Sequence, residues 1–375
     1  MNKKRQLGGM TPHRFLQRHW QKVPLLIRSA FEPGNWILDL DDLIELSQDP
    51  LCSSRLVVKN RSAYRVTYGP FKKSDFRHLP EDSWTFLVQG VNYVNRHVNE
   101  LLDHFSFIPY ARLDDVMISY STRGGGVGPH YDSYDVFLLQ GKGPKKWQVS
   151  DQTNLELQPD SDLKLLRDFQ PTGSCQLEDG DMLYLPPKFS HNGIASEESL
   201  TYSIGFDALK FNQIKSEFLS FIDEKIKLKG IFTDPDRQPT NEPAHIPVDL
   251  IHQIENQLGH IKWKKKDIFL FLGELITAKN THLVETRAKK TTKRTFQSQL
   301  EKTSFVLHPA IKLLYFDKYA FIGGETIALK DSDIYSFRSF ANDRIVNGRH
   351  LDPNSLFVQK LYEWFESGFI EICDK

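Results

Sequence analysis

The segment "GGGVGPHYDSYDVFLLQGKGPKKWQVS", residues 124–150, decides how this chain folds. It contains two short runs that are rich in β-branched and aromatic residues, "YDVFLLQ" and "KKWQVS", separated by the turn sequence "GKGP". Gly and Pro favour turns, whereas β-branched and aromatic residues favour strands. The segment therefore predicts two consecutive strands, which we expect to pair as a hairpin.

Further short strands are predicted on both sides of this segment. Three more short apolar runs are interrupted by turn residues: "DDVMISYS" (114–121), "DMLYLP" (181–186) and "LTYSIGF" (200–206). Many short strands with Gly and Pro turns are typical of a jelly roll or barrel. Upstream, residues 13–110 mix predicted helices and strands, and Asp39 is a plausible helix N-cap. We expect an α+β protein whose sheet domain occupies residues 1–210.

Beyond residue 210 the apolar pattern lengthens to a helical period. Apolar residues recur every three or four positions at Phe211, Ile214, Phe218, Phe221, Ile222 and Ile226. The helical pattern resumes in 248–263 and 266–278, after a proline-containing loop at 233–247. Apolar helix faces outside a sheet domain need a surface that buries them, and a second copy of the chain is an economical one. We therefore expect residues 211–290 to form a helical homodimerisation segment.

The last part of the chain, residues 291–375, is predicted to form a small separate module. It combines an apolar segment at 305–315, a hairpin that turns on Gly323 and Gly324, and a closing helix in 355–370. This order resembles a winged helix, which by itself assigns no function.

Composition narrows the function classes. The 375 residues carry 48 Lys plus Arg and 48 Asp plus Glu, so no overall field recruits nucleic acid or an anionic membrane. No run reaches the roughly 18 apolar residues of a membrane span, and we expect a cytoplasmic protein without membrane contact. The three cysteines lie far apart and predict neither a disulfide framework nor a structural zinc site.

Three side chains predict a metal site. His130 and Asp132 lie two positions apart, so on a strand their side chains project from the same face. His191, which follows a predicted strand and a Pro-Pro turn, is the best candidate for a third ligand. Two imidazoles and one carboxylate form the facial triad of non-haem Fe(II) oxygenases, which leaves positions open for a cosubstrate and dioxygen. A lone His-x-Asp pair is usually an ordinary loop, so the prediction depends on His191.

A dianionic cosubstrate such as 2-oxoglutarate needs a buried cation for its far carboxylate. Lys145 and Lys146 project to opposite faces of a predicted strand, and Lys145 shares its face with Trp147, which predicts that Lys145 points inward. Ser119 and Ser121 fall on one face of another strand and offer hydroxyls to the same carboxylate, although hydrogen bonding to the backbone is an equal alternative.

The glycines at positions 124, 125, 126 and 128 do not match the dinucleotide-binding pattern, because Pro129 follows and no βαβ unit surrounds them. We interpret them as room for a substrate backbone beside the metal.

Together, residues 114–150, "LEDGDMLYLPPKFSHNGIA" (177–195) and "TYSIGF" (201–206) resemble the JmjC-type ribosomal oxygenases, in particular their bacterial arginine-hydroxylating members. The resemblance extends upstream through "FLQRHWQKVPLLI", "SRLV" and "LVQGVNYV", and more loosely downstream through the three-part order. It implies a JmjC double-stranded β-helix and an Fe(II)- and 2-oxoglutarate-dependent dioxygenase. The implied substrate is an arginine of the sixteenth large-subunit ribosomal protein, hydroxylated at its β-carbon.

The resemblance also implies roles for individual residues. His130, Asp132 and His191 match the iron ligands. Ser119, Ser121, Lys145 and Thr201 are implied to bind the cosubstrate, with Lys145 where the bacterial members carry arginine and Thr201 where some members carry asparagine. Asp114, Asp115 and Ser133 are implied to contact the substrate, Asp114 matching the acid that binds the guanidinium and Asp115 being an adjacent rival.

Other functions remain open from the sequence. N-methyl-lysine demethylation uses the same triad, and the acidic "LDD" at 113–115 suits either cation. A cupin-like binding module that serves ribosome assembly would lack a triad or anchor residue, and none is missing. The basic residues Lys289, Lys290, Lys293 and Arg294 are candidates for ribosomal RNA contact, although their linker setting favours a solvated hinge.

Overall fold

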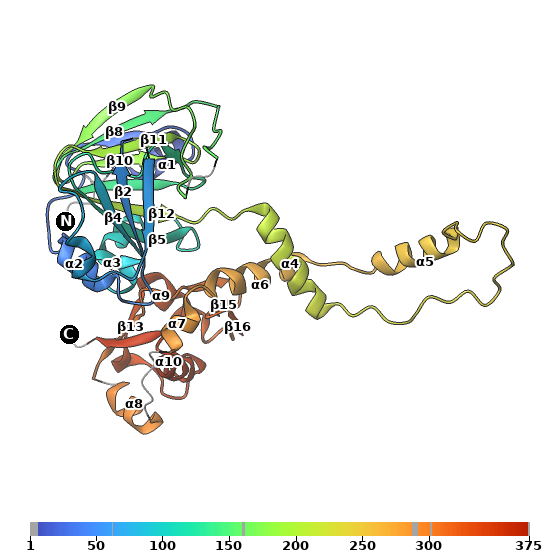
Figure 1. Cartoon of the computed structure of the whole chain (residues 1–375). Coiled ribbons are helices and arrows are strands. Elements are labelled where there is room, and N and C mark those ends of the chain that lie inside the picture. Colours follow the sequence, from blue (N-terminus) through green and yellow to red (C-terminus); the bar gives the residue numbers. More distant parts are fainter. Residues whose placement is uncertain (1–6, 62, 160–161, 287–291, 301, 374–375) are drawn as a thin grey trace.

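A computed structural model describes residues 7–61, 63–159, 162–286, 292–300 and 302–373. Within these residues the chain forms a β-rich part, a helical segment with a protruding arm, and a small C-terminal module (Figure 1). Among the described helices, none combines the length and hydropathy that a membrane-spanning segment needs.

The β-rich part contains two antiparallel sheets. The larger has the strand order β1-β10-β7-β12-β5-β4-β2-β3 and the smaller has the order β6-β11-β8-β9. The strands of the larger sheet are β1 (Leu25–Ile27), β2 (Ser53–Asn60), β3 (Ala63–Tyr68), β4 (Trp84–Gln89), β5 (Leu113–Ser121), β7 (Val136–Lys142), β10 (Met182–Leu185) and β12 (Ser199–Phe206). Those of the smaller sheet are β6 (His130–Tyr131), β8 (Lys145–Ser150), β9 (Gly173–Leu177) and β11 (Ser190–Ala195). This arrangement is the expected double-stranded β-helix.

The predicted hairpin between "YDVFLLQ" and "KKWQVS" is wrong. Strand β7 pairs with β10 and β12, whereas β8 pairs with β11 and β9 in the other sheet. The turn at 141–144 therefore carries the chain from one sheet to the other. Gly143 has φ +68°, and a Cβ there would lie 2.0 Å from the Glu198 carbonyl oxygen, so the crossing requires glycine.

Short helices cover the outer face of the larger sheet. They are α1 (Pro12–Arg18), α2 (Leu40–Leu46), α3 (Arg96–Leu102) and the 3-10 turns η1 (Lys73–Phe76), η2 (Val91–Tyr93) and η3 (Asp103–Phe105). Asp39 caps α2 in a capping box with Asp42, as its N-cap position predicts. The main core lies under these helices, where Phe15, Phe105 and Phe137 are fully buried. The larger sheet is therefore held rigidly from outside while its inner face stays available for a site.

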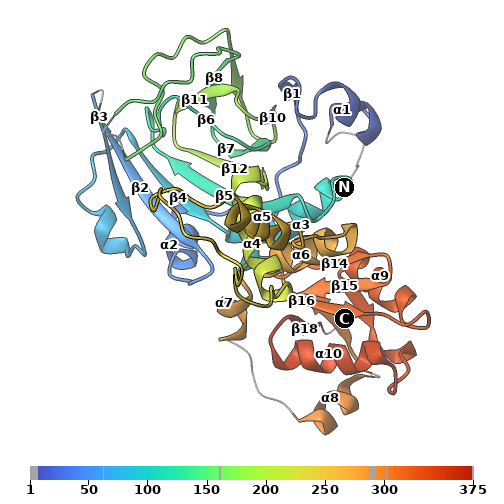
Figure 2. The same ribbon diagram turned by 90° about the vertical axis from the view of Figure 1, so that its right-hand side faces the viewer.

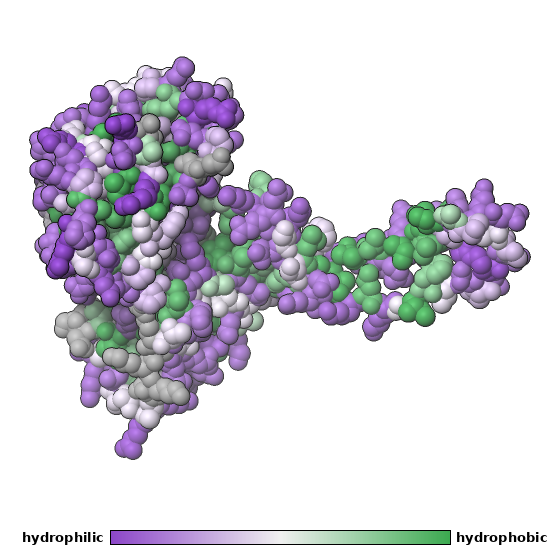
Figure 3. All heavy atoms as spheres, in the orientation of Figure 1, coloured by the Kyte–Doolittle hydropathy of each residue, from purple (hydrophilic) through white to green (hydrophobic). Residues whose placement is uncertain are grey.

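The helical segment consists of α4 (Phe211–Lys225), α5 (Val248–Leu258), α6 (Lys265–Thr277) and α7 (Thr281–Glu285). Helices α4 and α6 contact each other, whereas α5 stands far from the rest of the protein at the end of two long connections (Figure 1). Apolar side chains remain exposed along this arm, which Figure 3 shows as green atoms; Phe211, Ile231 and Val248 are 89%, 88% and 56% exposed. The predicted apolar helix faces exist. The face of α4 packs on α6, where Phe218 and Phe221 contact Phe271, whereas the apolar residues of α5 and its connections stay exposed.

The C-terminal module lies against the β-rich part, and α6 packs on its strands β14, β15 and β16 (Figure 2). Its elements are α8 (Lys293–Leu300), β13 (Ser304–Leu307), β14 (Leu313–Phe316), β15 (Tyr319–Ile322), β16 (Glu325–Ala328), α9 (Ile334–Asp343), β17 (Ile345–Asn347), η4 (Gly348–His350), α10 (Leu356–Glu366) and β18 (Ile370–Cys373). The hairpin at Gly323 and Gly324 is present as β15–β16. The closing helix ends earlier than predicted, at Glu366, because Gly368 turns the chain at φ +74° into β18. Leu51 and Tyr93 of the β-rich part lie in the module's core, so the two parts share a hydrophobic contact.

Candidate active site

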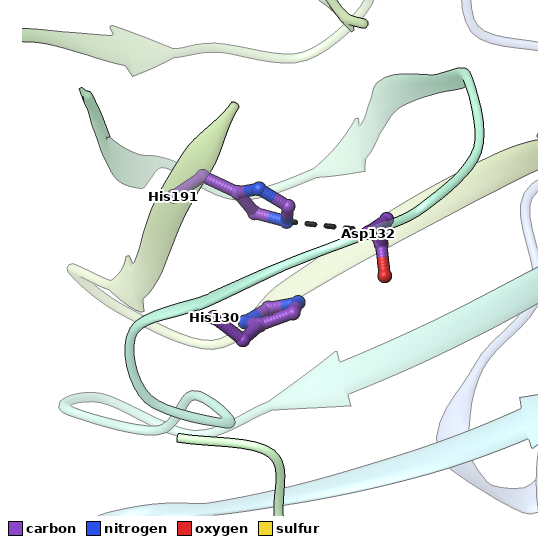
Figure 4. Close-up of side chains that lie close together, drawn as sticks. All are labelled: His130, Asp132 and His191. Carbon is purple, nitrogen blue, oxygen red and sulfur yellow. Dashed lines mark ion pairs between the residues drawn. The ribbon is translucent and has the colours of Figure 1, made fainter. Parts of the chain in front are cut away.

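Two histidines and one aspartate meet in the interior of the double-stranded β-helix. His130 in β6 and His191 in β11 are direct cross-strand partners, and Asp132 follows β6 immediately. One ligand atom of each residue lies within 4.8 Å of the others, and Asp132 Oδ2 is 3.7 Å from His191 Nε2 (Figure 4). The structure thus brings together the three side chains that the sequence proposed as ligands.

Hydrogen bonds to the backbone orient both imidazoles. His130 Nδ1 lies 2.9 Å from the Gly128 carbonyl oxygen, and His191 Nδ1 lies 3.0 Å from the Phe189 carbonyl oxygen. Because a carbonyl only accepts, each Nδ1 carries the proton and each Nε2 keeps a free lone pair. Burial, with a smaller contribution from neighbouring His130, lowers the pKa of His191 to about 4, so its imidazole is neutral at pH 7. The His191 ring is therefore in the form that binds a metal, and the backbone hydrogen bonds leave Nε2 of each ring as the candidate ligand atom.

The glycines before His130 serve the protein's own packing. A Cβ on Gly125 would lie 2.4 Å from the Trp84 carbonyl oxygen, and one on Gly126 would lie 2.2 Å from the Gly193 carbonyl oxygen. Gly128 has φ +77°, a conformation that other residues rarely adopt. These glycines allow residues 124–129 to approach β4 and β11 closely enough to place His130. Their interpretation as room for a substrate backbone stays a prediction, and Gly126 lines the cavity described below.

Lys145 points into the interior, as its alternation with Trp147 predicts. Its side chain is 3% exposed, and Nζ lies 3.5 Å from Ser119 Oγ and 3.4 Å from Ser121 Oγ. Within the described residues it has no carboxylate partner, and its other close contact is the Trp147 ring, 5.3 Å away. Burial lowers the pKa of Lys145 to about 8. Lys146, on the opposite face, is exposed.

One cavity, with a volume of about 210 Å³, connects the triad with this lysine. Ser119, Lys145, His130, Asp132 and His191 all line it. Thr201 is buried, but its hydroxyl donates to Gln140 Oε1 at 3.1 Å and does not line the cavity. Ser133 is exposed and also lies outside the lining. The roles implied for Thr201 and Ser133 therefore stay predictions, without a contact that supports them.

The two neighbouring acids on β5 have different surroundings. Asp115 is 8% exposed and lines the cavity, and burial, reinforced by the charge of Asp114, raises its pKa to about 6. Asp114 lies at the edge of the cavity, where it forms an ion pair with Lys279 from the turn after α6. Asp115 therefore offers the better-placed carboxylate for a cation that enters the cavity.

The sequence reasoning missed several lining residues. Tyr134 reaches the cavity from the segment between β6 and β7, Gln89 from β4 and Arg55 from β2. Trp147 and Met117 complete its apolar wall. Tyr134 carries a local signal, because it lies two positions after Asp132 in "HYDSYD". Arg55 and Gln89 carry none, because only the pairing of β2 with β4 and of β4 with β5 places them there.

A double-stranded β-helix with two histidines and one aspartate inside defines the class of JmjC-domain oxygenases, and a profile of the JmjC domain matches residues 100–214. The chain is 35% identical over 266 residues to ribosomal protein uL16 3-hydroxylase of Escherichia coli, an alignment that covers 70% of each protein. It is 36% identical over 203 residues to a probable ribosomal oxygenase of Haemophilus influenzae, covering 52% of this chain and 49% of that protein. The chain therefore belongs to the ribosomal oxygenase family of JmjC proteins.

A solved structure extends this similarity to all three parts of the chain. YcfD, a ribosomal oxygenase from Escherichia coli in complex with cobalt and 2-oxoglutarate, superposes with a TM-score of 0.79 at 27% identity. The superposition covers 97% of this chain and 99% of YcfD. The order of double-stranded β-helix, helical segment and C-terminal module is therefore shared with a ribosomal oxygenase.

Proposed function

We propose that this protein is an Fe(II)- and 2-oxoglutarate-dependent dioxygenase that hydroxylates an arginine β-carbon on the sixteenth large-subunit ribosomal protein, uL16. One observation carries the proposal: the His130, Asp132 and His191 triad shares a cavity with a buried lysine that has no described carboxylate partner, and with a buried aspartate. The family supports it, because its relative from Escherichia coli is named for uL16 3-hydroxylation.

The three side chains fit iron. Two imidazoles and one carboxylate are the donor set of non-haem Fe(II) oxygenases, and three protein ligands leave positions for a cosubstrate and dioxygen. When bound, the iron supplies the activation of dioxygen that the protein's own side chains cannot perform. His130, Asp132 and His191 would hold it.

Lys145 fits the far carboxylate of 2-oxoglutarate. A buried ammonium without a carboxylate partner is costly in an empty site, and a dianion that enters the cavity removes that cost. Ser119 and Ser121 lie within 3.5 Å of Nζ, and Ser119, which lines the cavity, offers a hydroxyl donor beside it. Ser121 lies outside the lining and accepts a hydrogen bond from Thr85. The Nε1 atom of Trp147 is buried and has no hydrogen-bond partner in the part of the chain that the structure describes, so a further donor is available at the cavity wall.

Asp115 is the candidate receptor for the substrate's guanidinium. A buried carboxylate pairs best with a planar donor that makes two parallel hydrogen bonds, which arginine offers and methylammonium does not. The arginine side chain would enter between Asp115 and Tyr134 and hold its β-carbon towards the triad. The protein contributes this orientation and a cavity walled by Met117, Val136 and Trp147 that limits water.

Incubation of the full-length protein with Fe(II), 2-oxoglutarate and purified uL16 tests the proposal. We expect succinate formation and a mass increase of one oxygen atom on a single arginine, located by tandem mass spectrometry. The variant Asp132→Ala controls for non-enzymatic oxidation. Formaldehyde release from a methyl-lysine peptide would instead support demethylation, and the absence of any succinate formation would support a non-catalytic binding module.

The protein is proposed to act as a homodimer in the cytoplasm, where ribosomal proteins are assembled. Exposed apolar residues of α5 and its connections, among them Ile231, Val248 and Leu258, need a partner surface, and a second copy offers matching helices. Light scattering should give twice the chain mass, and Ile251→Asp on the exposed face of α5 should weaken the dimer.

The ribosomal RNA contact stays a prediction: Lys289 and Lys290 lie outside the described residues, whereas Lys293 and Arg294 begin α8.

The domain boundaries are proposed at residues 210 and 290. Strand β12 ends at Phe206 and α4 begins at Phe211, which fits the first boundary. The second lies outside the described residues.

A further inference from the structure

The ion pair between Lys279 and Asp114 joins the helical segment to the strand that carries Asp115. Lys279 lies in the turn between α6 and α7, and its Nζ contacts Asp114 Oδ1 directly. Asp114 is 22% exposed at its side chain, so this pair is only partly accessible to water. A fixed positive charge therefore lies beside one of two consecutive carboxylates.

The C-terminal module fixes the position of this lysine. Helix α6 packs on the β15–β16 hairpin, where Thr326 Oγ1 donates to Glu274 Oε1 at 2.6 Å and the Gly324 N–H donates to Thr277 Oγ1 at 3.1 Å. A Cβ on Gly273 would lie 2.2 Å from the Phe321 ring, which shows how closely the helix approaches β15. The turn that carries Lys279 directly follows this anchored helix end.

A second ion pair crosses the same boundary. Lys312, just before β14, lies 3.4 Å from Asp207, which follows β12. Asp114 and Asp115, which line the cavity, and Asp207, which lies beside them, thus form an acidic group, and the two lysines that face it come from outside the double-stranded β-helix. Among the described residues, Asp114 and Asp207 have lysine partners and Asp115 has none.

We propose that Lys279 is a positioning residue for substrate recognition: by pairing with Asp114 it neutralises that carboxylate and leaves Asp115 as the acid of this group that receives the substrate's cation. The inference rests on the proposed function for the identity of the cation. It gives the docked C-terminal module a role in catalysis, because α6 and the β15–β16 hairpin hold Lys279 in place. Without that docking, the substrate end of the cavity would be incomplete.

The electrostatics of Asp115 support this assignment. The groups that act on it are Asp114 on its own strand, Gln89 of β4, Lys279, and Asp207 after β12, and it acts in turn on Tyr93 and Tyr134. Burial and the two acids raise the pKa of Asp115, whereas Lys279 and the hydrogen bond with Gln89 lower it. Loss of Lys279 removes a favourable charge and also leaves the charge of Asp114 unbalanced, so Asp115 would hold its proton to a higher pH.

The variant Lys279→Met tests the proposal through a property that requires no substrate. We expect the pKa of Asp115, followed by carboxyl ¹³C NMR in full-length protein loaded with diamagnetic Zn(II), to rise by about one unit or more. The signal is assigned with Asp115→Asn. Lys279→Arg should leave the pKa of Asp115 at its wild-type value. Asp114→Asn combined with Lys279→Met should return the pKa of Asp115 most of the way to that value. An unchanged pKa in Lys279→Met would overturn the proposal.

Substrate kinetics give the second readout. For Lys279→Met we expect KM for the arginine substrate to increase roughly fivefold or more near pH 6 and less than about twofold near pH 8.5, with kcat at saturating substrate little changed. Lys318→Met, which removes an exposed ion pair with Asp331 elsewhere in the module, is the matched control. An equal loss at both pH values would indicate a merely structural role. Failure of the proposed function would appear differently, as wild-type protein without arginine hydroxylation.

Discussion

The ammonium of Lys145 lies 3.4 Å from the hydroxyl of Ser121 inside the double-stranded β-helix, and both side chains are buried. Within the residues that the structure describes, no carboxylate pairs with the charge of Lys145. Strand β8 supplies the lysine from the smaller sheet, and β5 supplies the serine from the larger one. The site therefore contains a cation that is poorly stabilised until a dianion binds.

Replacement of Lys145 by methionine should have opposite effects on ligand-free stability and on cosubstrate affinity. The pKa of Lys145 is lowered to about 8 from an ordinary value of 10.5. At neutral pH, the buried charge therefore destabilises the folded protein by about 3 kcal/mol. Lys145→Met should therefore raise the melting temperature of the ligand-free protein. Addition of 2-oxoglutarate and Mn(II) should raise the melting temperature of the wild type more than that of the variant. A variant that is less stable and still binds 2-oxoglutarate normally would contradict the anchor role.

The affinity for 2-oxoglutarate should fall as the pH rises above about 8. Lys145 is protonated below its pKa and neutral above it, so the form that binds a dianion is lost in that direction. Calorimetric Kd values measured between about pH 6.5 and 9.5 should show this decrease in the wild type. In Lys145→Arg, whose guanidinium does not titrate in this range, whatever affinity remains should vary less with pH.

Removal of one triad side chain should abolish turnover without unfolding the protein. We expect His191→Ala to lower succinate formation by more than about 100-fold. Loss of a metal ligand should exceed the 10- to 100-fold effect of losing a residue that only hydrogen-bonds to a ligand. Iron content after dialysis should fall in parallel. The exposed His97 offers a control: His97→Ala should bind iron and turn over like the wild type.

Gly126→Ala should impair the metal site through the backbone. The added Cβ would lie 2.2 Å from the Gly193 carbonyl oxygen and push the segment that precedes β6 away from β11. We expect a destabilisation of about 1–3 kcal/mol and a measurable loss of metal affinity. Gly173→Ala is the matched control, because its Cβ would meet Val149 at an ordinary 3.5 Å. Equal metal affinity in both variants would refute the packing role of Gly126.

The loop that carries Asp132 depends on the buried Asp135. Its carboxylate accepts hydrogen bonds from Tyr184 Oη at 2.6 Å and Gln21 Nε2 at 2.9 Å, and it lies 3.6 Å from the Arg112 guanidinium. Asp135→Ala leaves these donors and the cation without their partner, so we expect a loss of roughly 3–5 kcal/mol. Tyr184→Phe removes a single donor and should cost about 1–2 kcal/mol. Denaturant unfolding of both variants distinguishes the two effects.

The sequence by itself determined the local features of this protein. Spacing and strand alternation placed His130 and Asp132 together and turned Lys145 inward beside Trp147, because side-chain direction on a strand alternates with period two. Short strands with Gly and Pro turns predicted the double-stranded β-helix, and the helical period beyond residue 210 predicted α4, α5 and α6.

Only the tertiary structure decided which distant segments meet. Strand pairing is non-local, so the sequence could not show that β7 and β8 lie in different sheets or that the glycines before His130 serve close backbone contacts. Nor could it separate Asp114 from Asp115. The structure buries Asp115 in the cavity and pairs Asp114 with Lys279, which lies far along the chain in the turn after α6.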